Sequence, residues 1–148
     1  MSVAFLSSLR SIDAAHRGGT CIVNQENRIV GIGYCGYPRG LDEKDLTETD
    51  KTFCMCHSIM NAILNKNQYD IRGCRIYTTR FPCNECAKLV TQCGINRVTF
   101  AGMQPENTTS ASKILFTLAG VSICQFTPKD RKEITLGTGI HIESPKVK

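Results

Sequence analysis

Three side chains of the kinds that bind metal ions place the strongest constraint on how this chain folds. Cys83 and Cys86 are separated by two residues and follow Pro82, and His57 lies in a separate segment upstream. Cysteines at this spacing on the first turn of a helix point their sulfur atoms the same way, and a helix N-terminus favours the thiolate form. If the three side chains share one metal ion, the fold must bring two helix starts together.

The cysteine pair by itself has other interpretations. In a reduced protein, a Cys-x-x-Cys pair is also compatible with a redox couple or with two core thiols. The proline before the pair and the histidine upstream favour a metal, because three ligands at two helix starts form the open arrangement of a catalytic zinc site. We therefore predict one Zn²⁺ ion bound by His57, Cys83 and Cys86.

Length and composition limit the classes of protein that fit this sequence. The 148 residues suit one domain, and the apolar runs are far too short to span a membrane. The nine cysteines are odd in number and dispersed, which argues for a reducing compartment, the cytoplasm or the nucleus. The net charge of +5 is modest and spread along the chain, so neither a membrane nor a nucleic-acid partner is expected.

Strands and helices are expected to alternate along the chain. Strand-like runs occupy residues 20–23, 28–34, 75–79, 97–101 and 121–126. Helical patterns occupy residues 3–9, the segment that begins at His57, the segment from Pro82 to Gly94, and residues 110–119, whereas residues 41–52 suit a polar surface loop. This order predicts an α/β fold of three layers, with a mixed sheet of about five strands between helices. Residues 1–128 are expected to form this domain and residues 129–148 a polar C-terminal tail.

Long phrases outside the metal-binding residues add to this interpretation. They are Ala4-Phe5-Leu6-Ser7 with Arg10-Ser11, Cys21-Ile22-Val23-Asn24, Ile29-Val30-Gly31-Ile32-Gly33-Tyr34, Asn61-Ala62-Ile63, Leu115-Phe116 and Ala119-Gly120-Val121. Together with the phrase from Phe81 to Leu89, they resemble the deoxycytidylate deaminase family, within the cytidine deaminases. The resemblance extends to about Pro128. It implies a five-stranded cytidine-deaminase fold, one zinc ion, deoxycytidine monophosphate as substrate and a homo-oligomer, from dimer to hexamer.

The resemblance also shows where this chain departs from the family. Zinc nucleobase deaminases carry the signature H-x-E followed by P-C-x-x-C, and the Glu moves protons between the metal-bound water and the base. Here Ile59 occupies the position of that catalytic Glu, and Ser58 that of an Ala whose backbone meets the substrate. Cys35 stands where the family has Asn, and Ala15, within Ala14-Ala15-His16, where it usually offers polar groups to the nucleotide. Cys35, Ser58 and Ala15 are therefore weak candidates for substrate binding.

Three functions are compatible with these observations. An isoleucine cannot carry protons, and losing one positioned acid–base group typically lowers a rate by about 10² to 10⁴. The favoured hypothesis is a catalytically impaired or inactive deaminase-like zinc protein, a pseudoenzyme that serves as a binding or assembly module. The alternative is a zinc-dependent deaminase that converts dCMP to dUMP, captured with its Glu replaced. A nucleic-acid-binding module on the same fold is the most distant alternative.

Several further expectations concern ligands and partners. Glu85 and Glu43 are the candidate substitutes for the missing carboxylate, but a helix should turn the side chain of Glu85 away from the metal, and Glu43 cannot be placed from sequence. Two roles are open for Cys35: a fourth zinc ligand, or a buried thiol that fills the space left by Asn. Another protein and residual binding of a deoxycytidine nucleotide are the remaining candidate partners.

Overall fold

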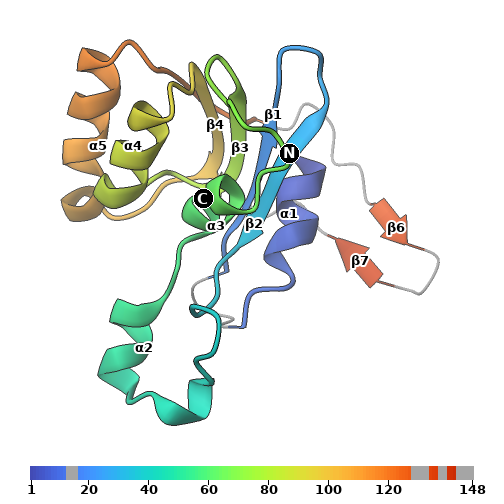
Figure 1. The fold of residues 1–148 in the computed structure, drawn as a ribbon, viewed down its shortest axis with the longest axis vertical. Helices are drawn as coiled ribbons and strands as arrows, with labels where there is room; N and C mark the ends of the chain where they lie inside the picture. The colour runs from blue at the N-terminus through green and yellow to red at the C-terminus, as the bar shows by residue number, and fades with distance from the viewer. Residues whose placement is uncertain (13–16, 128–133, 137–139, 143–148) are drawn as a thin grey trace.

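The computed structural model describes residues 1–12, 17–127, 134–136 and 140–142, the last two ranges as backbone only (Figure 1). Its helices are α1 (Ser2–Ser8), the short 3₁₀ helix η1 (Glu43–Asp45), α2 (Glu48–Cys54), α3 (Ser58–Leu64), α4 (Asn84–Gln92) and α5 (Glu106–Leu118). Its strands are β1 (Gly19–Val23), β2 (Ile29–Tyr34), β3 (Arg75–Arg80), β4 (Arg97–Gly102), β5 (Ser122–Gln125), β6 (Ile134–Leu136) and β7 (Ile140–Ile142). No helix within the described ranges is long and apolar enough to cross a lipid bilayer.

One mixed sheet organises the molecule. Its strand order is β2-β1-β3-β4-β5. Strand β1 pairs antiparallel with β2 and β3, whereas β4 pairs parallel with β3 and β5. Parallel neighbours need crossover connections, and α4 and α5 provide them. The predicted α/β fold with a mixed five-stranded sheet is therefore confirmed.

Helices cover both faces of this sheet (Figure 1). On one face, α1 lies so close to β1 that a Cβ atom at Gly19 would collide with the α1 backbone. On the other face, a Cβ atom at Gly33 of β2 would collide with the α3 backbone. Helices α4 and α5 share the face of α3, because Val90, Phe116 and Ala62 belong to one buried core. The three predicted layers are present.

The main core lies between the sheet and helices α3 to α5. Ile22, Ile76 and Val98 are in register across β1, β3 and β4, and each is 0% exposed. Fully burying an aliphatic side chain of this size stabilises the folded state by about 1.5–3 kcal/mol. All the cysteines are free thiols, so apolar packing rather than disulfide cross-linking holds the fold together.

Three segments differ from the sequence prediction. Residues 41–52 are not a plain loop, because they contain η1 and most of α2, which Thr47 and Asp50 start with a reciprocal capping box. Helix α5 begins at Glu106 rather than at Ser110, since an acidic residue is favourable in a first helical turn. Strands β6 and β7 pair within the segment expected to be a polar tail. The remainder of that segment lies outside the described residues.

Close contact between β2 and α3 yields a prediction about stability. Gly33→Ala should destabilise the fold by about 1–3 kcal/mol, the usual cost of overpacking, because the new methyl group meets the backbone at Ser58 and Ala62. Gly36→Ala is the matched control, since its methyl group would find its nearest neighbour, Tyr34 Cε2, at 3.8 Å. Thermal unfolding of both variants measures the difference, and equal melting temperatures would contradict the prediction.

Candidate metal centre

Two helix starts carry the predicted ligands. His57 is the N-cap of α3, Cys83 is the N-cap of α4, and Cys86 lies in the first turn of α4. Pro82 thus precedes the cap rather than occupying the first helical turn, a small correction to the sequence prediction. Cys83 and Cys86 nevertheless lie at the same helix start, one as its N-cap and the other in its first turn, as their spacing predicted.

The neighbouring backbone fixes both helix starts. Before α3, the backbones of Gly36 and Cys56 exchange two hydrogen bonds of 3.2 and 2.9 Å, and Asn61 Nδ2 donates to the Tyr34 carbonyl oxygen at 2.8 Å. Before α4, the Phe81 N–H donates to the Gly102 carbonyl oxygen at 2.8 Å. The ring of Phe81 is 1% exposed and lies in the core, which anchors the chain immediately before the cysteine pair.

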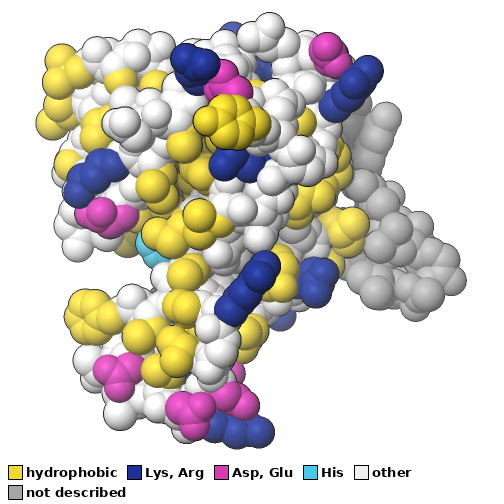
Figure 2. Space-filling view, in the orientation of Figure 1, with side chains coloured by type: hydrophobic (Ala, Val, Ile, Leu, Met, Phe, Trp, Pro, Cys, Tyr) yellow, Lys and Arg dark blue, Asp and Glu magenta, His cyan; other side chains and the backbone are white. Residues whose placement is uncertain are grey.

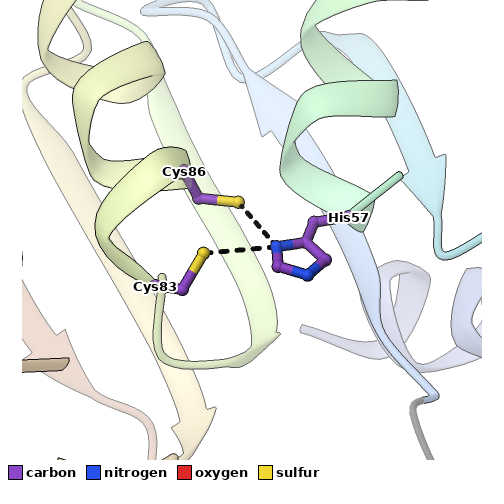
Figure 3. A group of neighbouring side chains, drawn as sticks. All are labelled: His57, Cys83 and Cys86. Carbon is purple, nitrogen blue, oxygen red and sulfur yellow. Dashed lines mark hydrogen bonds between the residues drawn. The ribbon is translucent and has the colours of Figure 1, made fainter. Parts of the chain in front are cut away.

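The three candidate ligands converge on one point (Figure 3). His57 Nδ1 lies 3.2 Å from Cys83 Sγ and 3.4 Å from Cys86 Sγ. The ligand atoms of all three residues lie within 4.8 Å of one another. One imidazole nitrogen and two thiol sulfurs are a donor set that Zn²⁺ prefers, and three protein ligands leave a coordination position open. The predicted metal-binding residues are therefore brought together.

Electrostatics around the sulfurs also favour a cation. Hydrogen bonding from the Cys86 thiol, together with His57, lowers the pKa of Cys83 to about 4. The hydrogen bond with Cys83 raises the pKa of His57, and the same thiolate, with burial, raises the pKa of Cys86. These shifts favour the thiolate form of Cys83, and a bound metal ion would displace the proton of the second thiol.

A cavity of about 380 Å³ opens in front of these ligands. One of its walls is formed by η1 and α2, which we call the arm (residues 43–54), and Figure 2 shows the hollow between the arm and the rest of the molecule. The remaining walls come from α3, β3 and the residues around Cys83. The lining residues used below are His57, Ser58, Ile59, Thr78, Arg80, Cys83, Cys86, Cys35, Glu43, Glu48, Lys51 and Gln104.

Ile59 and its neighbour contribute differently to this cavity. The side chain of Ile59 is 3% exposed, belongs to the apolar core and lines the cavity beside the metal ligands. Ser58 is buried, and its Oγ lies 2.8 Å from Thr20 Oγ1 in a hydrogen bond. The cavity wall therefore presents a hydrocarbon side chain two residues after the candidate ligand His57.

Cys35 and Ala15 were the other weak candidates for substrate binding. Cys35 lines the cavity and is 7% exposed, and burial raises the pKa of its thiol. The described residues place only His57, Cys83 and Cys86 in the compact ligand group, so the geometry fits the buried-thiol role of Cys35. Ala15 lies outside the described residues.

The sequence named Glu43 without placing it, and it did not identify Glu48, Lys51 or Arg80 as cavity residues. Glu43 and Glu48 of the arm line the cavity, and Lys51 Nζ forms ion pairs with both, at 3.3 and 2.7 Å. The capping pattern at Thr47 is the signal that could have placed them on an ordered helix. Arg80 was also missed, although it lies just before the Phe-Pro-Cys phrase. Glu85 points away as predicted, because it lies outside the cavity wall and pairs with Lys88 at 2.8 Å.

Comparisons with known proteins agree with this geometry. The family described as the cytidine and deoxycytidylate deaminase zinc-binding region matches residues 1–102. The deoxycytidylate deaminases of Mus musculus and Homo sapiens are 47% and 44% identical to this chain, over 89% of this chain and 80% of each relative. The crystal structure of dCMP deaminase from the cyanophage S-TIM5 has a TM-score of 0.71 and 24% identity, over 84% of this chain and 92% of that chain, which shows the shared fold. The chain therefore belongs to the cytidine and deoxycytidylate deaminase family, and its cofactor is zinc.

Proposed function

We propose that this protein is a pseudoenzyme, a zinc-holding member of its family that binds a ligand in the metal pocket without hydrolytic deamination. The observation that carries the proposal is the position of Ile59. Its side chain lies in the cavity wall, two residues after His57, and is packed into the core. No movement of this side chain can supply an acid or a base, because it has no titratable atom.

Deamination needs more than an activated water. When bound, zinc lowers the pKa of a coordinated water toward neutrality. Protons must still be delivered to the ring nitrogen of the base and to the leaving ammonia. His57, Cys83 and Cys86 are committed as ligands, so this transfer requires another group in the cavity.

The carboxylates of the described cavity wall are poor replacements. Glu43 and Glu48 both lie on the arm, and both are held in ion pairs by Lys51. Burial raises the pKa of the Cys35 thiol, which disfavours the thiolate that a base would need. None of these groups occupies the place of Ile59, so the proposed role is ligand binding.

A second candidate function is an active dCMP deaminase. Two observations favour it: the relatives of 44% to 47% identity are named deoxycytidylate deaminases, and the carboxylate of Glu43 reaches the cavity wall. In that case Glu43 would leave its ion pair with Lys51 and transfer protons in place of the missing Glu. Activity measurements separate this candidate from the pseudoenzyme.

Assembly and location belong to the same proposal. A homo-oligomer between dimer and hexamer, or another protein partner, is supported by large exposed apolar side chains such as Phe53 and Leu118, each 84% exposed. The free cysteines support a reducing compartment, the cytoplasm or the nucleus. We keep residues 1–128 as the deaminase-like domain and residues 129–148 as a separate tail within this proposal.

Metal content tests the first part of the proposal. Protein purified without added zinc should contain about one equivalent, and Cys83→Ser or Cys86→Ser should lower both the zinc content and the melting temperature, because metal binding adds to folding stability. Cys124→Ser is the control, since Cys124 is exposed on β5. A wild-type zinc content below about a third of an equivalent, with Cys83→Ser as stable as wild type, would contradict the proposed zinc binding.

Turnover tests the second part. Release of ammonia from dCMP should be undetectable for the zinc-loaded wild type, because Ile59 cannot transfer protons. Ile59→Glu alone should restore little activity, since Cys35 still occupies the nucleotide side of the pocket. Robust wild-type turnover that disappears in Cys86→Ala, the control for a contaminating enzyme, would establish the active deaminase instead. Calorimetric titration of the same samples with dCMP measures residual nucleotide binding.

A further inference from the structure

Arg80 is a cation in the metal pocket that the proposed chemistry does not use. It is the last residue of β3, where its backbone is in register with Gly102, and its side chain is half-buried and lines the cavity. Arg80 and Cys35 line the same cavity as the three metal ligands. Burial raises the pKa of the Cys35 thiol, and the charge of Arg80 is among the contributions that oppose that rise. Arg80 therefore lies on the metal side of the cavity rather than on the arm side.

The described part of the chain provides no counter-ion for this guanidinium. Its acidic cavity residues are Glu43 and Glu48. Both lie on the arm, where they pair with Lys51 of the same segment. No ion pair or side-chain hydrogen bond of Arg80 is present among the described residues. Ile59, which lines the same wall, adds no negative charge. An unpaired charge in a partly enclosed site is unfavourable, and a bound anion would relieve that cost.

We propose that the metal pocket binds a small oxyanion, a carboxylate or a phosphate, with the guanidinium of Arg80 as its binding group. The planar fork of arginine matches both anions and can form two parallel hydrogen bonds to either one. The cavity of about 380 Å³ is large enough for an oxyanion together with the small molecule that carries it. This inference rests on the proposed binding role and names the chemical class of its ligand.

The chemistry of the guanidinium also limits which group of a ligand it can bind. Arginine offers only donors, so it pairs with oxygen acceptors and not with an exocyclic amino group. The nearby hydroxyls of Ser58 and Thr78 are already engaged through Thr20, at 2.8 and 3.2 Å. No described residue forms an ion pair or a side-chain hydrogen bond with Arg80, and its guanidinium would select for negatively charged oxygen.

Titration calorimetry of zinc-loaded protein provides the test, with inorganic phosphate in one arm and acetate in the other. Saturable binding of at least one of the two anions is expected, and the tighter one identifies phosphate or carboxylate as the source. Arg80→Leu should weaken that binding by about tenfold or more, as expected when a charge-assisted pair is removed. Arg97→Leu is the matched control and should change the affinity less than about twofold, because Arg97 is exposed on β4 and outside the cavity wall.

Further variants keep the test decisive. Should Arg80→Leu fold poorly, as judged by its melting temperature and zinc content, Arg80→Gln takes its place and should show the same loss. Ile59→Glu should also weaken the binding about tenfold or more, because a carboxylate in this wall would pair with Arg80 and repel the ligand. Absence of saturable binding by the wild type, or equal affinities of wild type and the Arg80 variant, would overturn the inference.

Ammonia release from dCMP, measured on the same samples, separates this inference from the proposed function. Anion binding that depends on Arg80 in a protein that deaminates dCMP would overturn the pseudoenzyme and leave the anion site standing. An inactive protein without anion binding would overturn the anion site and leave the pseudoenzyme standing.

Discussion

The close contact between α3 and strand β2 is the constraint on which the metal site depends. Glycine at position 33 lets the α3 backbone approach the sheet, and the Asn61 side chain then fastens the first turn of α3 to the Tyr34 carbonyl oxygen. On the opposite side, the buried ring of Phe81 fixes the start of α4. The separation between the imidazole and the two sulfurs is thus set by how these two helix starts pack against the sheet.

Once this scaffold is given, the chemistry of the cavity depends on the side chains that line it. Ile59 is part of the same apolar core as Ala62 and Val90, so its side chain adds to packing and offers no titratable atom to the cavity. Ile59 and Arg80 line the same cavity, and Ile59 brings no negative charge to the guanidinium. In the proposed function, the lack of hydrolysis and the anion preference would therefore have a common electrostatic origin. A family fold by itself decides neither outcome, because function resides in the groups that face the ligand.

Local patterns in the sequence were sufficient for most of the fold and for the metal ligands. The Cys83 and Cys86 spacing, with proline before it, is a local signal, and β1 to β4 follow from short apolar runs bounded by turn residues. The arm was missed because its helix has no buried residue and therefore no apolar period, and only its capping box marks it. Arg80 was missed for a different reason. A basic residue at the end of a strand has no distinctive pattern, and its importance arises only when β3, α3 and the arm enclose one cavity.

The arm has a consequence for how the cavity responds to its surroundings. No residue of η1 or α2 is buried, so this segment is held by its capping box and by the exposed ion pairs of Lys51 rather than by apolar contacts. Such pairs weaken as ionic strength rises, and segments with few buried contacts open locally at much lower free energy than core strands. The two walls of the metal pocket therefore belong to units of unequal stability. We therefore expect amide hydrogens of α2 to exchange through local opening and those of β1 and β3 to require global unfolding, with a gap that added salt widens.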